Sequence, residues 1–463
     1  MLSNGLKVAS EPRFGQFCTV GVILDSGSRY ELAFKSGITH FLEKLSFNRT
    51  SEYESKDHIQ QDLEKHGGIC DCQGSRDSLI YAASIDSRGL ETIVKILSEV
   101  SLRPRFDEAD LEAIRQTIQF ELEDISMRAD QEPILMDLIH AAAFRSNTLG
   151  LPKLCPIENL EHIDSPMLYN FLKLYNQPNR MVLAGVGVDH DRLVEFAEKY
   201  FFQQKPIWQK EFSLVENALV TELDYSLAQY TGGLQRLEKD LSNICPGPSP
   251  IPNLAHFVIG FESASHRALE DYVPTCVLSM MMGGGGSFSA GGPGKGMFTR
   301  LYTNVMIQHY WIHNATAYNH AYVDGGLFCI HASAHPSKLG DVVDIIGREC
   351  KEMAGKIDAI ELRRAKAQLQ SMLLMNLEAR PVLFEDIARQ VLANGHRKSP
   401  QFFLEQIEKV TEDDINRVVD RMLKSKLSVA ALGDTSKLPV LEEIENTLNV
   451  RNNSKRFNVF HYK

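Results

Sequence analysis

The chain has 463 residues, of which 43% are hydrophobic and 24% are charged, a balance typical of a folded globular protein. This length predicts two or more domains. The formal net charge of −11 argues against nucleic acid as the main partner, because phosphate binding requires a basic face. No stretch approaches eighteen uninterrupted apolar residues, so we expect no membrane-spanning helix.

Eight cysteines are few for this length, and most lie in apolar runs, which is typical of buried thiols in a reducing compartment. His66, Cys70 and Cys72 could belong to a metal cluster, but no second pair follows at zinc spacing, so we expect no zinc there. No leader pattern precedes Leu6, and any targeting segment is expected outside this sequence.

The two halves of the chain repeat the same order of strands and helices. A strand-like run at 20–25, followed by a helix at 38–47, matches a run at 257–262 followed by a helix that ends at Met282. Three further pairs match at similar offsets: runs beginning at Tyr81 and Phe328, helices beginning at Asp110 and Glu361, and strand–helix units beginning at Met181 and Leu427. The offsets of roughly 237 to 251 residues predict a duplicated domain.

Each half interleaves alternating strands with long amphipathic helices, such as the helix with apolar residues three and four positions apart from Leu111 to Ile125. This pattern predicts an α/β (α+β) fold with helices layered on a sheet. The segment 204–253 contains paired glycines and several prolines. We expect it to link an N-terminal domain, 1–203, to a C-terminal domain, 254–463.

The helix predicted near residue 40 carries His40, Glu43 and Lys44 on one face. A second histidine at position 44 would complete His-x-x-Glu-His, the inverted zinc motif in which two imidazoles hold the metal and the carboxylate activates its water. The ammonium of Lys44 offers no lone pair to a cation. The third ligand in such enzymes is a carboxylate far downstream, and Glu121 follows Lys44 after 76 intervening residues. These four residues predict a degenerate zinc site without metal, in which Lys44 forms a salt bridge with Glu121 or Glu43.

Between Met282 and Met297 the chain has eight glycines in fourteen residues. Glycine loses the most backbone entropy on ordering and packs no side chain, so such a run in a folded domain requires a reason. A mobile loop without Cβ atoms can offer its N–H and C=O groups to an extended peptide at close range. The residues expected to bind substrate are Gly283, Gly284, Gly285, Gly286, Ser287, Phe288, Ser289, Gly291, Gly292, Gly294, Lys295 and Gly296.

Other interpretations of this segment fit less well. A phosphate-binding loop requires Gly-x-x-x-x-Gly-Lys-Ser/Thr, but Ser289 stands at the first glycine position and Gly296 follows Lys295. A passive linker stays an alternative, although linkers rarely contain Phe and Pro between two amphipathic helices. Phe288 and Met297 could supply apolar contacts, whereas Lys295 is unsuited to bind a cation.

The degenerate zinc motif, the spacing to its third acid, the doubled α/β unit and the glycine-rich segment together resemble the pitrilysin-like family of inverted-motif metallopeptidases. Within that family they resemble the alpha-subunit branch of the mitochondrial processing peptidases. The resemblance extends from Asn4 to about Asn449 and includes Tyr230-Thr-Gly-Gly, Asn376-Leu-Glu and Arg389-Gln-Val-Leu.

The resemblance implies two homologous domains, each a mostly antiparallel sheet covered by helices on one face, which form half of a clam-like heterodimer. It implies a non-catalytic subunit that recognises presequence peptides in the mitochondrial matrix, while a catalytic beta subunit holds zinc and this chain holds no cofactor. The segment 283–296 would then bind the presequence. Two alternatives stay open: a structural core subunit of the cytochrome bc1 complex, and an autonomous zinc peptidase in which another ligand replaces Lys44.

Overall fold

The structure is a computed structural model that describes residues 1–128, 131–145, 147–215, 220–242, 244, 253–286 and 297–449. The chain forms two compact units, which we describe separately. Unit 1 comprises Met1–Asp124, Ser146–Ala228 and Met372–Phe403, and unit 2 comprises Ile125–Arg145, Gln229–Ser371 and Leu404–Lys463. Among the described residues, no helix is both long and apolar enough to cross a lipid bilayer.

Unit 1 is built on a five-stranded sheet with the order β1-β5-β2-β4-β3. Its strands are β1 (Lys7–Glu11), β2 (Phe17–Leu24), β3 (Ile69–Gly74), β4 (Leu79–Asp86) and β5 (Met181–Val186). β1 and β5 run parallel, and the other neighbouring pairs run antiparallel. The prediction of a mostly antiparallel sheet is confirmed in this unit.

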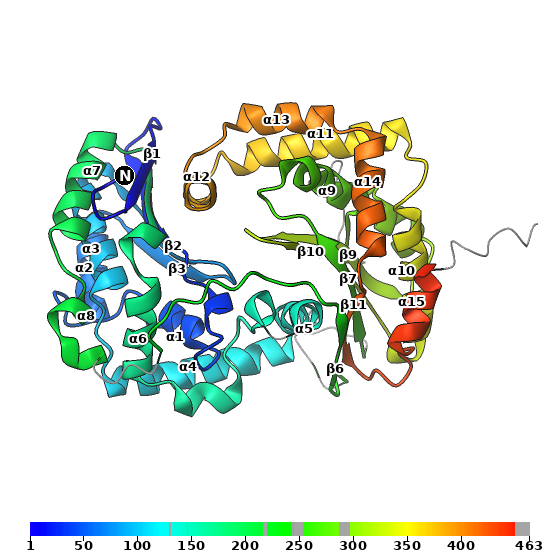
Figure 1. Cartoon of the computed structure of the whole chain (residues 1–463), viewed down its shortest axis with the longest axis horizontal. Helices are drawn as coiled ribbons and strands as arrows, with labels where there is room; N and C mark the ends of the chain where they lie inside the picture. Colours follow the sequence, from blue (N-terminus) through cyan, green and yellow to red (C-terminus); the bar gives the residue numbers. More distant parts are fainter. Residues whose placement is uncertain are drawn as a thin grey trace, which may run out of the picture. The chain divides into compact units, whose positions relative to one another are not determined.

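Helices cover both faces of the unit 1 sheet (Figure 1). The helices are α1 (Ile38–Lys44), α2 (Lys56–Glu64), α3 (Leu90–Leu102), α4 (Glu108–Met127), α6 (Ser165–Tyr175), α7 (His190–Ala197), α8 (Ile207–Lys210) and α12 (Arg380–Asn394). Val22 of β2 points into the core that contains α3, whereas Ile23 points into a second core that contains α12. α12 lies so close to β2 that a Cβ atom on Gly21 would stand 2.4 Å from the ring of Phe384.

The expectation of helices on one face is therefore wrong for unit 1. Local periodicity identifies the apolar stripe of α12 but does not reveal which sheet the stripe covers. α12 comes from the C-terminal half of the chain and completes a unit formed mostly by the N-terminal half.

Unit 2 repeats this topology in a six-stranded sheet with the order β6-β11-β7-β10-β9-β8. Its strands are β6 (Gly233–Glu238), β7 (Ala255–Ser263), β8 (Gly284–Gly286), β9 (Ile312–Ala321), β10 (Gly326–Ala334) and β11 (Ser428–Gly433). β6 and β11 run parallel and the other pairs antiparallel, as in unit 1. The predicted duplication is confirmed by this shared order, and β8 is an addition at the edge.

Helices also cover both faces of the unit 2 sheet (Figure 1). They are α5 (Glu132–Phe144), α9 (Leu269–Met282), α10 (Leu339–Glu352), α11 (Ala359–Asn376), α13 (Pro400–Lys409), α14 (Glu412–Lys424) and α15 (Leu441–Asn449). α10 and α14 pack on one face, while α5 packs on the other, where a Cβ atom on Gly260 would stand 3.3 Å from Cδ1 of Ile139. α5 comes from the N-terminal half, so each unit contains one sheet-covering helix from the opposite half of the chain.

The segment 204–253, which we expected to be a linker, contains α8 and the strand β6. β6 pairs with β11 from Gly233 opposite Ser428 to Glu238 opposite Gly433. Its partner β11 lies far away in the sequence. The glycine and proline content of 204–253 therefore predicted a linker and gave no indication of the strand. The boundaries of the two repeats at residues 203 and 254 remain predictions.

Candidate functional site

The predicted zinc-motif helix is α1, and a buried carboxylate fixes its start. Glu31 is 1% exposed. Its Oε2 accepts a hydrogen bond from the Gly37 N–H at 2.7 Å, and its Oε1 accepts one from the Thr39 N–H at 2.7 Å. An acceptor with negative charge suits the free N–H groups at a helix N-terminus. Glu31 thereby sets the direction in which the first turn presents His40.

A second contact fixes the proton on His40. Gly37 has a φ of +114°, and a Cβ atom there would stand 2.3 Å from the Cys155 sulfur, so glycine permits this close approach. The Cys155 N–H donates to Nδ1 of His40 at 3.1 Å, and His40 is 4% exposed. Because a backbone N–H only donates, Nδ1 acts as the acceptor and Nε2 carries the proton of the neutral imidazole.

The structure brings the four predicted residues together, with Glu121 of α4 at the centre. Nε2 of His40 donates to Glu121 Oε2 at 3.1 Å. Nζ of Lys44 lies 2.8 Å from Glu121 Oε2 and 3.4 Å from Glu43 Oε1. Lys44 therefore bridges both carboxylates. Its positive charge stands where the motif would place a second metal-binding imidazole.

These contacts hold the cluster in its charged form. The hydrogen bond from His40, together with the hydrogen bond and charge of Lys44, lowers the pKa of Glu121 from 4.5 to about 2, although burial acts in the opposite direction. Burial tends to lower the pKa of Lys44, but the hydrogen bond with Glu121 and the charges of Glu121 and Glu43 raise it above the usual value. At neutral pH the site is an ion pair between an ammonium and a carboxylate.

The residues present do not fit a zinc ion. Lys44 offers no lone pair to a metal. A histidine that binds a metal through Nε2 carries its proton on Nδ1 and needs a hydrogen-bond acceptor there. In this structure a donor, the Cys155 N–H, points at Nδ1 of His40, so the proton lies on Nε2 and blocks metal binding at that nitrogen. The carboxylate of Glu43, which would activate a metal-bound water, accepts the Gly74 N–H at 2.7 Å. Across the described residues, no group of three or more His, Cys, Asp or Glu is arranged to hold a metal.

Sequence reasoning missed three parts of this site: Glu31, Gly74 and Cys155. A carboxylate shortly before the predicted helix was a usable signal for Glu31, because acidic side chains favour helix N-termini. Gly74 and Cys155 act through backbone N–H groups, which every non-proline residue carries, so their type gives no signal.

The described part of the glycine-rich segment begins with a strand. α9 ends at Met282, and Gly284–Gly286 form β8, with Gly284 opposite Thr316 of β9. We expected a loop from Gly283 onward. The structure differs because a residue without a Cβ atom can lie against β9, where a Cβ on Gly284 would stand 1.9 Å from the Ala315 oxygen. The other predicted residues lie outside the described residues: Ser287, Phe288, Ser289, Gly291, Gly292, Gly294, Lys295 and Gly296.

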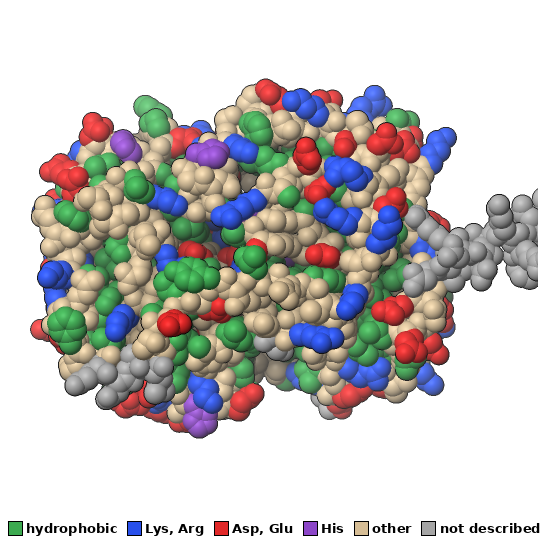
Figure 2. Space-filling model, viewed as in Figure 1, with side chains coloured by type: hydrophobic (Ala, Val, Ile, Leu, Met, Phe, Trp, Pro, Cys, Tyr) green, Lys and Arg blue, Asp and Glu red, His purple; other side chains and the backbone are tan. Residues whose placement is uncertain are grey.

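The face of the molecule drawn in Figure 2 shows Lys and Arg side chains interspersed with Asp and Glu. Nucleic-acid binding requires a basic patch or stripe. On this face the two charge signs are mixed rather than gathered into one patch.

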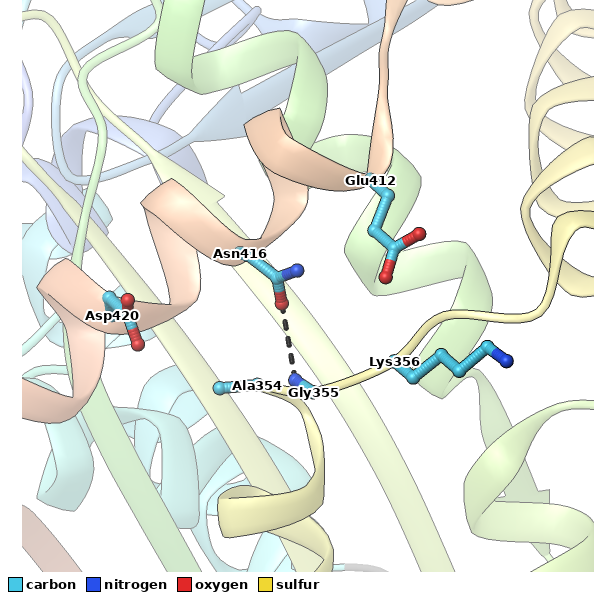
Figure 3. Close-up of a pocket in the computed structure, with 6 residues that line it drawn as sticks. All are labelled: Ala354, Gly355, Lys356, Glu412, Asn416 and Asp420. Carbon is cyan, nitrogen blue, oxygen red and sulfur yellow. Dashed lines mark hydrogen bonds between the residues drawn. The ribbon is translucent and has the colours of Figure 1, made fainter.

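Unit 2 has a shallow depression of about 490 Å³ between the end of α10 and the helix α14 (Figure 3). Its lining residues are Ala354, Gly355, Lys356, Glu412, Asn416 and Asp420. The Gly355 N–H donates to Asn416 Oδ1 at 3.1 Å, while Lys356 extends away from Asn416 and Asp420. The lining carries both charge signs, with one lysine, two carboxylates and one amide side chain.

Comparison with known proteins identifies the family. Residues 7–157 match the family described as Insulinase (Peptidase family M16), and residues 162–369 match the Peptidase M16 inactive domain. The chain belongs to the M16 peptidase family. The first match contains β1 to β4, and the second begins before β5 of unit 1 and continues into unit 2.

Several relatives of this chain carry the name mitochondrial-processing peptidase subunit alpha. The protein from Pongo abelii is 54% identical over 447 residues, which cover 96% of this chain and 84% of that protein. The protein from Homo sapiens is 53% identical over 447 residues, with the same two shares. The protein from Caenorhabditis elegans is 43% identical over 458 residues, which cover 99% of this chain and 88% of that protein.

Proposed function

We propose that this chain is the non-catalytic, substrate-recognising subunit of a heterodimeric zinc endopeptidase that removes N-terminal presequences from proteins imported into mitochondria. One observation carries the proposal: Nζ of Lys44 stands 2.8 Å from Glu121 in an M16 motif that would otherwise hold zinc. An M16 chain with this ion pair lacks the means to activate a water. Its contribution to a peptidase is therefore to bind and place the peptide.

The proposed partner is a catalytic beta subunit in the mitochondrial matrix. Zinc held by that partner would supply a water activated for attack on the scissile carbonyl. The present chain would hold the presequence so that the scissile bond lies at the partner's metal. Alignment of this kind lowers the barrier by removing translational and rotational freedom before the chemical step.

The proposed presequence-binding element is the glycine-rich segment, Gly283–Gly296. Its first residues support this role, because Gly284 already brings its backbone against β9 at a distance that any side chain would prevent. A backbone without Cβ atoms can approach an extended peptide in the same way. Lys295 would repel the arginines of a presequence, so we expect acidic side chains outside the segment to bind them.

A role as a structural core subunit of the cytochrome bc1 complex is less well supported, because the relatives reported above are named as subunits of a processing peptidase. An autonomous zinc peptidase is also less well supported. It would require a replacement for Lys44, the other tautomer of His40 and the release of Glu43 from Gly74.

The test compares the purified chain alone with the chain assembled with a zinc-competent partner. Binding of a fluorescent, arginine-bearing presequence peptide is measured by anisotropy, its cleavage by chromatography, and zinc content by elemental analysis. We expect the isolated chain to carry no stoichiometric zinc and to cut nothing, whereas the assembled pair cuts the peptide.

A deletion variant then tests the binding element. Removal of residues 287–296 should weaken peptide binding at least about tenfold, while gel filtration shows an intact heterodimer. The deletion spares β8, so the sheet of unit 2 keeps its edge strand. Unchanged peptide binding in this variant, or zinc-dependent cleavage by the chain alone, would contradict the proposal.

A further inference from the structure

The described residues on the two sides of the glycine-rich segment are held by contacts within unit 2. We call this place the neck, and define it as Gly283, Gly284, Phe298, Thr299 and Arg300. On the first side, Gly283 and Gly284 have φ values of +54° and +103°, which favour glycine. A Cβ atom on Gly283 would stand 2.3 Å from Cγ2 of Thr299. These two glycines therefore serve close packing at the neck.

Thr299 joins the two sides of the neck. Its Oγ1 accepts a hydrogen bond from the Gly284 N–H at 3.2 Å, and the residue is 4% exposed. Gly283 is bound on its other side, because its carbonyl oxygen accepts the Ala317 N–H at 2.9 Å. One threonine side chain thus links the strand that enters the segment to the residues that follow it.

Helix α11 holds the second side of the neck. Nη2 of Arg364 donates to the Phe298 carbonyl at 2.7 Å, and its guanidinium lies 5.6 Å from the centre of the Phe298 ring. Glu361 accepts two hydrogen bonds from Arg300, from Nε at 2.7 Å and from Nη2 at 3.0 Å. Paired hydrogen bonds between arginine and a carboxylate fix orientation as well as distance. Glu361 and Arg364 lie one turn apart on α11 and so share a face.

We propose that Thr299, Glu361 and Arg364 are positioning residues for presequence capture, because they fix where the glycine-rich segment leaves and rejoins unit 2. The inference rests on the proposed function. The segment is attached to unit 2 through the neck, so the contacts of Thr299 and Arg364 fix the positions of the residues on its two sides. Loss of one of these contacts gives the neck residues conformational freedom that peptide binding must remove, which weakens binding.

The first test replaces Arg364 and uses its neighbour as the control. Arg364→Ala removes the bond to Phe298, whereas Arg363→Ala removes the same charge from an exposed position on the same helix. In the heterodimer with the catalytic partner, we expect Arg364→Ala to raise the Kd for the fluorescent presequence peptide about threefold to tenfold, the effect of one lost hydrogen bond to a charged group. Arg363→Ala should leave Kd within about twofold of the unmodified heterodimer.

The second test separates positioning from stability at Thr299. Thr299→Val removes the hydroxyl that binds Gly284, and Thr299→Ser retains the hydroxyl but removes a methyl group. We expect Thr299→Val to weaken peptide binding about threefold to tenfold and Thr299→Ser to restore Kd to near the unmodified value. A merely structural role would lower the thermal midpoint of both variants without separating their Kd values.

The outcomes distinguish this inference from the proposed function. Peptide binding unchanged in folded Arg364→Ala and Thr299→Val heterodimers, while deletion of 287–296 weakens binding, would overturn the inference alone. Peptide binding unchanged in the deletion variant as well would overturn both. Weaker binding in both neck variants, with Arg363→Ala and Thr299→Ser near the unmodified value, supports the positioning role.

Discussion

The two units use the same topological position for different purposes. In unit 1 the helix after β2 is α1, and the chain then passes through α2 to the edge strand β3. In unit 2 the helix after β7 is α9, and the chain then enters the glycine-rich segment, whose first residues form β8 outside β9. One repeat thus carries the Lys44–Glu121 ion pair at its helix, and the other carries an added edge strand after its helix.

Different physical forces stabilise these two places. In unit 1 the ammonium of Lys44 compensates the carboxylate of Glu121. Without Lys44, this carboxylate would lie near that of Glu43 with no cation between them. In unit 2 the absence of Cβ atoms allows one backbone to lie against another. The comparison teaches that one duplicated fold can hold an ion pair in one copy and a close backbone contact in the other. We therefore expect the stability of unit 1 to depend on the charges of Lys44 and Glu121, and the stability of unit 2 to depend on side-chain volume at Gly284.

The largest effect is expected for Gly284→Ala. A Cβ atom there would stand 1.9 Å from the Ala315 oxygen, and the φ of +103° disfavours alanine, so we expect a loss of about 2–4 kcal/mol in the stability of unit 2. Gly325→Ala is the matched control, because no atom lies within 4 Å of the added Cβ. Urea unfolding of both variants measures the difference. Equal unfolding midpoints would show that β8 does not lie against β9.

Glu121→Gln tests the charge at the unit 1 site. Glutamine keeps the size of the side chain but leaves Lys44 without its closest carboxylate, and we expect a loss of about 1–2 kcal/mol, reduced by the partial exposure of the pair. Glu161→Gln, at an exposed position of the same unit, should change stability by less than about 0.5 kcal/mol. Similar denaturation curves for the two variants would mean that the ion pair contributes nothing.

The contribution of Glu121 should depend on pH in a defined direction. Its pKa is lowered from 4.5 in the unfolded chain to about 2 in the folded chain, so the charged form stabilises the fold above pH 4.5. As pH falls from about 4.5 through about 2, this stabilisation is lost. The difference in unfolding free energy between the unmodified chain and Glu121→Gln should therefore shrink over that window. A constant difference from pH 7 to pH 3 would contradict the assignment.

The smallest effect is expected for Lys44→His in the presence of zinc. The variant completes the motif, but the Cys155 N–H still points at Nδ1 of His40, and turning the proton to that nitrogen would leave the N–H without its acceptor. We expect added Zn²⁺ to raise the thermal midpoint by less than about 3 °C, measured by scanning fluorimetry against a metal-free control. A much larger rise would show that Lys44 alone prevents metal binding.

Much of the candidate site was predictable because its signals are local or follow a regular spacing. His40 and Lys44 share a helix face in any α-helix, and the acid Glu121 lies on a helix with a clear apolar stripe. The strand–helix order of the duplication was visible for the same reason. The contacts of Cys155 and Gly74 were not predictable, because they depend on backbone groups that only folding brings to His40 and Glu43.

The sequence by itself determined the repeat and the lysine at the second imidazole position of the motif, because these follow from residue type and short-range periodicity. The mostly antiparallel sheets were expected only from the family resemblance. Tertiary structure decided that α12 from the C-terminal half covers the sheet of unit 1 and that α5 from the N-terminal half covers the sheet of unit 2. It also decided that β6 and β8 are strands and that a backbone N–H fixes the proton of His40. The physical reason is that packing and hydrogen bonding join groups distant in the chain, and a local pattern records which face of an element is apolar but not what covers it.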